Sequence, residues 1–217
     1  MIEAKDIFKS YDSVEVLKGI NLNIKAGEVV AITGDSGAGK STLLHVLSSL
    51  DKANSGEVLF EGKSLSVLSK NQLAKFRNKE VGFVFQNHQL LPELTALENV
   101  CLPAWIGKIS KSDAKKKAID LLEYLGMGHR VNHRPNQMSG GEQQRVAVAR
   151  ALINSPKVVF ADEPTGNLDS KNADLLHTYF MKLRDEFNTC FVIVTHNREL
   201  AEQTDRIIAL KDGKIAE

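Results

Sequence analysis

Residues 34–42, GDSGAGKST, match the phosphate-loop pattern G-x-x-x-x-G-K-[ST]. Backbone N–H groups of such a loop surround nucleotide phosphates, the lysine reaches the β- and γ-phosphates, and the hydroxyl after it contacts Mg²⁺. An apolar run at residues 29–33 precedes the loop, and a helical face follows it at Leu43, Val46, Leu47 and Leu50. We therefore predict a site for a nucleotide and Mg²⁺ formed by Gly34, Asp35, Ser36, Gly37, Ala38, Gly39, Lys40, Ser41 and Thr42.

Two adjacent acids, Asp162 and Glu163, follow the apolar run at residues 158–161. Acids at a strand end are often simple caps, but a phosphate loop in the same chain favours a functional role. Successive side chains of a strand point to opposite faces, so the two carboxylates can serve different purposes. Asp162 suits the water shell of Mg²⁺, and Glu163 suits a catalytic base that polarises an attacking water.

Gln86 and His196 each follow a buried apolar run, VGFVF and CFVIVT. The carboxyl ends of parallel strands meet at one edge of an α/β sheet, where ligands bind. One such polar residue is more often a satisfied loop residue, but two that converge on the same edge favour a shared site. We expect both to lie beside the phosphate loop.

A second glycine-opened helix start lies at Ser139, Gly140 and Gly141, in SGGEQQRVAVARAL. The first turn of a helix presents unpaired N–H groups and the positive end of the dipole, which suits an anion. The chain has one phosphate loop for these two helix starts. We therefore expect two copies to pair head to tail, so that each second start contacts the γ-phosphate held by the other copy.

Apolar periodicity predicts the elements that position these residues. Alternation near the N-terminus, as in GINLNIKAGE, predicts antiparallel strands with one wet face. Continuous apolar runs at residues 29–33, 158–161 and 190–195 predict parallel strands buried on both faces. Asp212-Gly213 predicts a hairpin near the C-terminus. The expected fold class is α/β, a P-loop NTPase core with a mostly parallel sheet and an N-terminal antiparallel β subdomain.

Residues 86–137 are expected to be mostly helical. Thr95 and Glu98 match a capping box, and a later helix over residues 114–125 is expected to have Ser112 as its N-cap and to stop at Gly126. We expect a single domain over residues 1–217, with 1–85 and 138–217 as the core and about 86–137 as a helical subdomain.

Length and composition exclude several classes of protein. The 217 residues are 42% hydrophobic and can fill a core without disulfides, and the sparse Cys101 and Cys190 indicate a reducing compartment. The 28 basic and 27 acidic residues give a net charge of +1, which disfavours nucleic acid as a partner. No membrane-span run or signal-peptide pattern is present in the sequence. We expect a soluble chain whose membrane contacts are made through partners.

Together these motifs resemble those of the ATP-binding cassette (ABC) ATPases over essentially the whole chain. MSGGEQQR resembles the family signature, Gln86 its Q-loop, the residues NLD at 167–169 its D-loop, and His196 its H-loop. Met138 stands where the family usually has leucine, a nearly isosteric exchange. The resemblance implies ATP stacked on Tyr11, Mg²⁺ held by Ser41, Gln86 and Asp162, catalysis by Lys40, Glu163 and His196, and Ser139, Gly140, Gly141 and Asp169 acting in trans.

ADEPTGNLD and SGGEQQR resemble the branch that powers lipoprotein release, macrolide-type export and cell-division signalling at the inner membrane. HRVNHRP, at residues 129–135, looks most like the lipoprotein-releasing ATPases. The resemblance implies an ATPase held by transmembrane permease subunits at the cytoplasmic face of the inner membrane. An export or division ATPase of the same branch is one alternative. A second alternative is a soluble cassette protein acting on nucleic acid or ribosomes, which the near-zero net charge disfavours. A third is a nucleotide switch without turnover, which the presence of Glu163 disfavours.

Three consecutive residues, Leu90, Leu91 and Pro92, fall in the loop between Gln86 and the helix expected after Thr95. Such a run is normally avoided on a soluble surface. We expect a hydrophobic socket for a short cytoplasmic helix of the permease. In the alternative, Leu91 and Leu94 fill the core of the helical subdomain.

Overall fold

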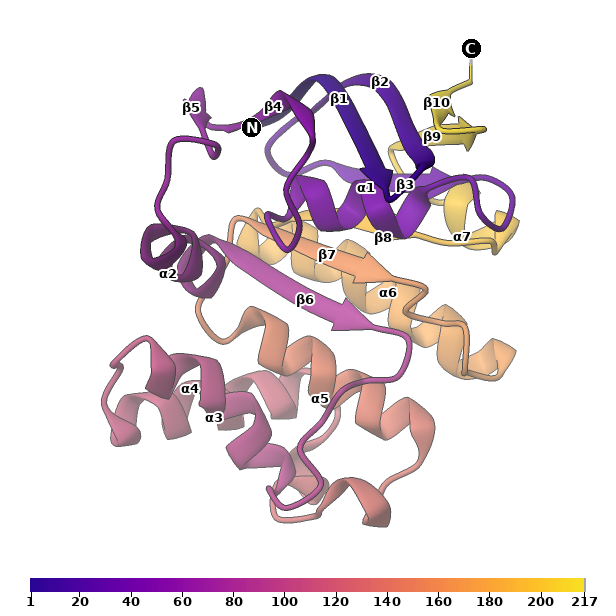
Figure 1. Ribbon diagram of the computed structural model, residues 1–217. Coiled ribbons are helices and arrows are strands. Elements are labelled where there is room, and N and C mark those ends of the chain that lie inside the picture. Colours follow the sequence, from indigo (N-terminus) through magenta and orange to yellow (C-terminus); the bar gives the residue numbers. More distant parts are fainter. Residues whose placement is uncertain (217) are drawn as a thin grey trace.

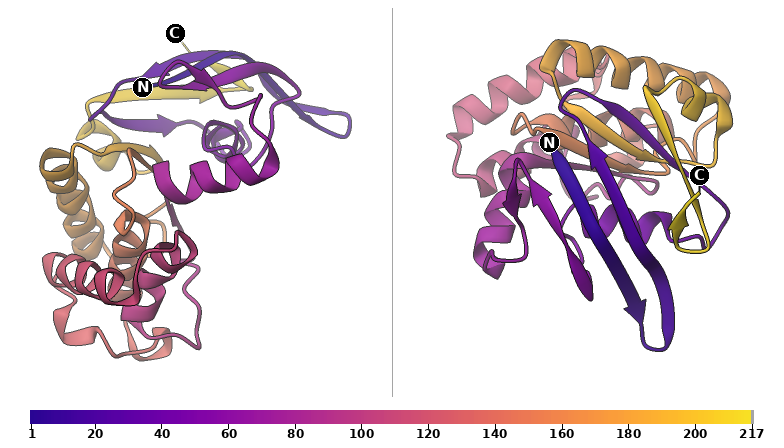
Figure 2. Two further views of the ribbon diagram at one scale, coloured as in Figure 1. Left: turned by 90° about the vertical axis from the view of Figure 1, so that its left-hand side faces the viewer. Right: turned by 90° about the horizontal axis from the view of Figure 1, so that it is seen from above.

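The chain folds into two sheets and a group of helices (Figure 1). The structure is a computed structural model that describes residues 1–216. The smaller, antiparallel sheet and the helices from the middle of the chain lie at opposite ends of the molecule (Figure 2). This arrangement confirms the predicted α/β class with an antiparallel β part and a helical part.

The larger sheet has the strand order β10-β9-β3-β8-β7-β6. Its parallel strands are β3 (Val29–Thr33), β6 (Val81–Phe85), β7 (Val158–Asp162), β8 (Cys190–Val194) and β9 (Arg206–Lys211). Strand β10 (Lys214–Ile215) pairs antiparallel with β9 through Asp212 and Gly213, both at positive φ, which confirms the predicted hairpin. Because the other strands run in parallel, the ends of β3, β6, β7 and β8 meet at one edge of the sheet.

The smaller sheet is antiparallel and has the strand order β2-β1-β4-β5. Its strands are β1 (Ile2–Tyr11), β2 (Val14–Ile24), β4 (Ser55–Phe60) and β5 (Lys63–Ser64). Ile20 and Ile24 are buried while Asn21 and Asn23 are exposed, so one face packs inward and the other is wet, as the alternation predicts.

Successive residues of the parallel strands pack on opposite sides of the larger sheet. Phe160 and Val192 join a core with the buried face of α1 (Lys40–Leu47) and the antiparallel sheet. Val159 and Phe191 join a second core with the helices on the other side. The larger sheet is therefore covered on both faces, which explains why its strands read as continuous apolar runs.

The remaining helices cover the second face or lie at the sheet edge. They are α2 (Lys70–Glu80), α3 (Ala96–Ile106), α4 (Lys111–Tyr124), η1 (Gly128–Arg130), η2 (Pro135–Gln137), α5 (Gly140–Leu152), α6 (Ser170–Phe187) and α7 (Arg198–Glu202). The capping box of Thr95 and Glu98 opens α3, as predicted. Helix α5 packs on α3, α4 and β6, so it joins the helical part to the sheet.

Two local predictions are wrong. Ser110, not Ser112, caps α4, because its Oγ accepts the N–H of Asp113 while the Ser112 hydroxyl bonds to Ser110. Leu50 does not belong to the buried face of α1 and is 45% exposed. The helix ends at Leu47, and Ser49 adopts a positive φ of 60°, which turns the chain away from that face.

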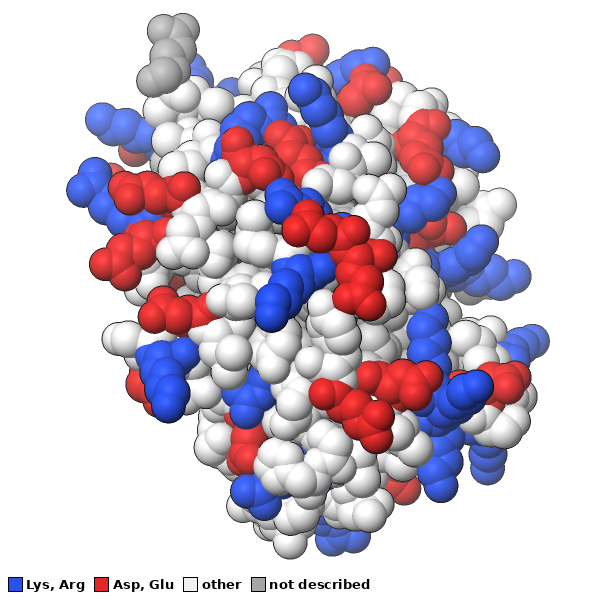
Figure 3. Space-filling model, turned by 180° about the vertical axis from the view of Figure 1, so that it is seen from behind, with Lys and Arg blue, Asp and Glu red and all other residues white. Residues whose placement is uncertain are grey.

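The surface carries both signs of charge. On most of the face seen in Figure 3, lysine and arginine side chains are interspersed with aspartate and glutamate, and several basic side chains gather at its lower right. Within residues 1–216, no helix has the length and apolar character needed to cross a membrane.

Candidate functional site

The predicted phosphate loop connects the end of β3 to the start of α1. Gly34, Gly37 and Gly39 all have positive φ, between 82° and 143°, a region that glycine enters at little cost. A Cβ at Gly34 would overlap the carbonyl oxygen of Leu210, so the neighbouring strand β9 also requires glycine there. The loop therefore curls tightly at the N-terminus of α1, where the helix dipole favours an anion.

Lys40 lies over this loop. Its Nζ donates to the carbonyl oxygens of Gly34 at 2.8 Å and Asp35 at 2.9 Å. The cation is therefore held within the ring of backbone that would surround phosphates. A cavity of about 400 Å³ opens beside it, lined by Val16, Ser36, Gly37, Gly39, Lys40, Ser41, Thr42, Glu163 and Val194.

The two acids at the end of β7 have different partners. Ser41 Oγ donates to Asp162 Oδ1 at 3.1 Å, which brings the expected metal-site hydroxyl and carboxylate together. Glu163 adopts a positive φ of 46°, and its N–H donates to Val194 O on the neighbouring strand. Its Oε2 lies 2.9 Å from Nδ1 of His196. The Ser41 hydroxyl and the Asp162 carboxylate are oxygen ligands of the kind that suits Mg²⁺, an ion that also keeps waters and binds substrate phosphates.

Gln86 follows β6, as expected, but its side chain lies on the loop after β7. Its Nε2 donates to Asn167 Oδ1 at 3.2 Å, and Asn167 Nδ2 donates back to Gln86 O at 3.2 Å. A Cβ at Gly166 would lie 2.8 Å from Gln86 Nε2, so the glycine leaves room for this side chain. Of the three residues expected to hold Mg²⁺, the structure therefore pairs Ser41 with Asp162, whereas the Gln86 side chain bonds to Asn167.

Tyr11, at the end of β1, is fixed by two residues that sequence reasoning missed. Its hydroxyl donates to Asp51 Oδ2 at 2.6 Å, and Lys9 Nζ lies 2.8 Å from the same oxygen and 4.7 Å from the ring centroid. The hydrogen bond to Asp51, together with burial, raises the pKa of Tyr11. The ring remains 45% exposed and available for stacking. The contact spans 40 residues, so no local pattern indicates it.

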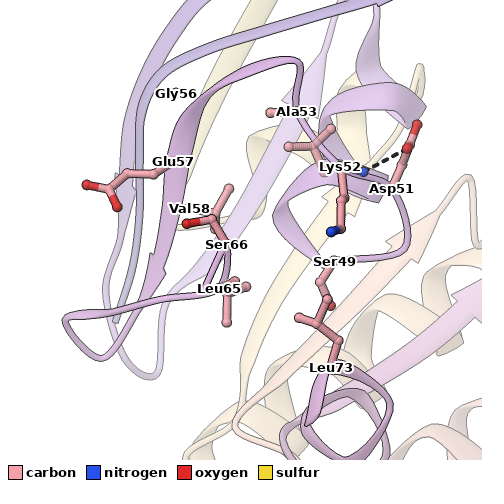
Figure 4. A pocket seen from close by; sticks show the side chains of 11 residues that line it. Ser49, Asp51, Lys52, Ala53, Gly56, Glu57, Val58, Leu65, Ser66 and Leu73 are labelled. Atoms are coloured by element: carbon pink, nitrogen blue, oxygen red, sulfur yellow. Dashed lines mark hydrogen bonds between the residues drawn. The ribbon is translucent and has the colours of Figure 1, made fainter. Parts of the chain in front are cut away.

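A smaller hollow of about 130 Å³ lies next to Asp51, between the end of α1, β4 and α2 (Figure 4). Ligand sites for small molecules usually have volumes of about 300–1,000 Å³. None of the predicted site residues lines this hollow, which is partly closed by Leu65 and Leu73. The larger cavity beside Lys40 has a volume within this range and is lined by residues of the phosphate loop.

The second helix start, at α5, has the capping geometry that its sequence predicts. Ser139 Oγ accepts the N–H of Glu142, and Glu142 Oε2 accepts the N–H of Ser139. The N–H groups of the first turn have no acceptor within the helix. Ser139 does not line the Lys40 cavity of its own chain, so one chain does not unite its two helix starts.

The starts of α5 and α6 lie side by side. Asp169 caps α6, with its Oδ1 accepting the backbone N–H of Asn172 at 2.8 Å. Its carboxylate also accepts hydrogen bonds from the Asn172 side-chain amide, and these backbone and side-chain hydrogen bonds lower the pKa of Asp169. A Cβ on Gly141 would lie 2.6 Å from Asn172 Oδ1, so the close approach needs glycine. Three of the residues expected to act in trans, Ser139, Gly140 and Asp169, are therefore exposed on one surface, whereas Gly141 is buried against Asn172.

The loop after Gln86 is held from two helices. Arg150 of α5 donates to the carbonyl oxygen of His88 at 2.7 Å, and buried Asn99 of α3 bonds both the N–H and the C=O of Leu91. Leu91 is 42% exposed, whereas Leu90 packs against the core. The structure thus places Leu91 on the surface and Leu90 partly inside it.

A groove of about 370 Å³ lies nearby, between α2, β6, α3 and α5. It is lined by Leu50, Arg77, Asn78, Val81, Gly82, Phe83, Phe85, Gln89, Pro103, Arg150, Ala151, Ile153 and Asn154. Gln89 places the groove in direct continuity with the loop that carries Leu91. Sequence reasoning had located the loop but not this groove, because its lining comes from four separate elements.

Comparisons with known proteins agree with this geometry. The family model described as "ABC transporter" matches residues 17–166. The lipoprotein-releasing system ATP-binding protein LolD of Cytophaga hutchinsonii is 56% identical, covering 99% of this chain and 98% of that protein. LolD of Bacteroides fragilis is 52% identical, over 99% and 100%. Among solved structures, a dimeric structure of the ABC transporter cassette MJ0796 is similar, with a TM-score of 0.92 at 44% identity, covering 100% of this chain and 97% of the other. A second dimeric structure of MJ0796, bound to ADP and Pi, has a TM-score of 0.92 at 43% identity and the same coverage.

Proposed function

The chain belongs to the ABC transporter family, and from this membership we propose that it powers a lipoprotein-releasing transporter of the inner membrane. It is an ATP-binding ATPase coupled to transport. The observation that carries the lipoprotein assignment is the similarity to lipoprotein-releasing ATP-binding proteins over nearly the full chain. Release would move lipoproteins from the inner membrane toward the outer membrane.

We assign the substrate-binding roles from the geometry of the cavity. Lys40 and the loop N–H groups hold the β- and γ-phosphates, and the exposed ring of Tyr11 stacks on adenine. The paired Ser41 and Asp162, with Gln86 completing the set, hold Mg²⁺. When bound, this ion neutralises charge on the phosphate oxygens.

In hydrolysis, a water attacks the γ-phosphorus, the bond from that phosphorus to the bridging oxygen breaks, and ADP leaves. Glu163 lines the same cavity as Lys40, so its carboxylate can accept the proton of that water. His196 Nδ1, at 2.9 Å, fixes the orientation of the carboxylate. Phosphate and ADP are the products.

We further propose that two copies close head to tail on two ATP molecules. The separation of Ser139 from the Lys40 cavity within one chain supports this arrangement, because the second helix start then contacts the phosphate of the other copy. The dimeric structures of the similar cassette support pairing of two such chains. Asp169 lies on the same surface and would contact the partner copy.

Transmembrane permease subunits are the proposed partners, and they would hold the ATPase at the cytoplasmic face of the inner membrane. The exposed Leu91 and the adjoining groove form the proposed docking site for a short amphipathic helix of the permease. The firm attachment of the loop through Asn99 and Arg150 supports this role. An export or division ATPase of the same branch would use a similar contact with another permease.

The test is Leu91→Glu, co-expressed with the candidate permease subunits and purified from membranes. We expect normal ATPase activity of the isolated subunit, but no co-purification and no lipoprotein release, because the carboxylate would be desolvated in the contact. Val67→Glu is the control, since Val67 is 79% exposed and lies before α2, away from the groove. Retained assembly of Leu91→Glu would refute the docking site. Partners of a different transporter, identified by mass, would overturn the lipoprotein assignment.

A further inference from the structure

A carboxylate lies in the first turn of the helix that we place next to the phosphate of the partner copy. Glu142 is the third residue of α5, and its Oε2 accepts the N–H of Ser139 at 2.8 Å. An unbalanced negative charge here would repel the γ-phosphate that Ser139 is proposed to contact. The helix start therefore needs a cation that offsets Glu142.

Arg130 supplies that cation. Its Nε donates to Glu142 Oε1 at 2.8 Å, so each carboxylate oxygen has a different donor. The side chain of Glu142 is 13% exposed and that of Arg130 is 32% exposed, which shields the pair from solvent. Burial alone would raise the pKa of Glu142, but the hydrogen bonds from Ser139 and Arg130 outweigh it and lower the pKa to about 2. His129 Nε2 is farther away, at 3.7 Å, and its side chain is 63% exposed.

The segment that carries Arg130 is itself anchored. The carbonyl oxygens of Val131 and His133 accept the N–H groups of Leu97 and Ala96, in the first turn of α3. Residues 130–133 thus join the start of α3 to the start of α5. Two backbone hydrogen bonds therefore hold the segment that places the Arg130 guanidinium against Glu142.

We propose that Arg130 is a positioning residue for the site of the partner copy, where it neutralises Glu142 and orients the Ser139 helix start toward the γ-phosphate. With Glu142 bound to Arg130 and to the Ser139 N–H, the hydroxyl proton of Ser139 and the N–H of exposed Gly140 remain as donors for the phosphate. This inference rests on the proposed ATP-bound dimer.

The test measures ATP-driven dimerisation by light scattering in a Glu163→Gln parent, which binds ATP without rapid turnover. Arg130→Gln is expected to raise the ATP concentration needed for half-maximal dimerisation by roughly tenfold, because each closed dimer uses the pair twice. Adding Glu142→Gln should restore dimerisation to within about twofold of the parent. The glutamine oxygen still accepts the Ser139 N–H, and no charge remains to be neutralised.

Arg134→Gln is the matched control, since Arg134 is an exposed cation of the same segment and has no ion pair within residues 1–216. Binding of fluorescent ATP to the monomer should be unchanged in every variant. Parent-like dimerisation of Arg130→Gln would overturn the proposal, as would a loss that Glu142→Gln does not rescue or that Arg134→Gln reproduces. A parent that does not dimerise on ATP would instead overturn the ATP-bound dimer, and this inference with it.

Discussion

Glu163→Gln tests the chemistry of the site with minimal change of shape. Glu163 Oε2 is contacted by Nδ1 of His196 at 2.9 Å and by the backbone N–H of His196 at 3.4 Å. The amide oxygen of glutamine can accept both contacts. The Glu163 N–H, which donates to Val194 O, is unaffected by the exchange. We therefore expect an unchanged fold and a site that lacks only its base.

The expected loss follows from the role of a general base. A positioned base contributes about 10²–10⁴-fold to a rate, which corresponds to roughly 3–5 kcal/mol of activation free energy. Turnover of ATP should fall by about that factor. Affinity for ATP should change by less than about threefold, because Lys40 and the Ser41–Asp162 pair, the residues proposed to hold the phosphates and Mg²⁺, are intact.

Phosphate release under single-turnover conditions measures the chemical step, and fluorescent ATP measures binding. Light scattering should show dimers that accumulate with ATP, because hydrolysis no longer reopens them. Glu123→Gln, an exposed carboxylate on α4, is the control and should keep parental turnover. Single-turnover hydrolysis by Glu163→Gln within threefold of the parent would refute the assignment of Glu163 as the base.

Four further substitutions probe the loop and the second helix start. Lys40→Ala should weaken binding of fluorescent ATP by about 10–100-fold, since a charge-assisted hydrogen bond contributes roughly 1.5–3 kcal/mol, and unchanged affinity would contradict the phosphate-loop assignment. Ser139→Arg should leave monomer affinity for ATP within about twofold but abolish dimerisation in light scattering, because its side chain fills the space for the partner's phosphate; persistent dimers would contradict the head-to-tail arrangement. Gly34→Ala should lower the free energy of unfolding, measured in urea, by about 2–3 kcal/mol, because the new Cβ overlaps Leu210 O. Gly37→Ala has open space around the new Cβ, so it should lower the free energy of unfolding by about 1–2 kcal/mol, from the positive φ alone. Equal losses in the two glycine variants would contradict the steric argument.

The parts of the fold that the sequence predicts well are those where burial dictates residue type. The strands at residues 29–33, 158–162 and 190–194 are covered on both faces, so nearly every residue in them is apolar. The hairpin at Asp212-Gly213 was predictable because both residues must adopt positive φ. In each case a requirement at the residue itself, burial in the strands and positive φ in the hairpin, selects the residue type.

One prediction failed where two nearby serines compete for the same role. Ser110 and Ser112 are both good caps, and Ser110 prevails because Asp113, three residues after it, bonds the Ser110 hydroxyl through both its N–H and its carboxylate, whereas the residue three after Ser112 is a lysine. That spacing is visible in the sequence and could have identified the correct cap. The turn at Ser49 was not predictable in the same way, because serine has no general preference for positive φ.

Contacts between distant segments could not be predicted from one sequence. Lys9 and Asp51, which fix Tyr11, belong to different elements, and the Gln86 side chain lies on Asn167, 81 residues away. Nothing in the local pattern at Asp51 distinguishes it from an ordinary exposed acid. Such polar residues take their role from the fold, so only the three-dimensional arrangement shows them.

The contacts at both ends of α5 connect the proposed permease-docking surface to the proposed site of contact with the partner copy. Near its C-terminal end, Arg150 holds the loop that carries His88 and leads to Leu91, and at its N-terminal end lies Ser139, the residue proposed to contact the partner copy. A helix of 13 residues is stiff along its axis, so a displacement at one end moves the other. If the permease contacts Leu91, its movement therefore changes how Ser139 meets the γ-phosphate. By reciprocity, ATP that draws Ser139 into the closed dimer must shift the loop against the permease, which is the direction of work that a transport ATPase requires.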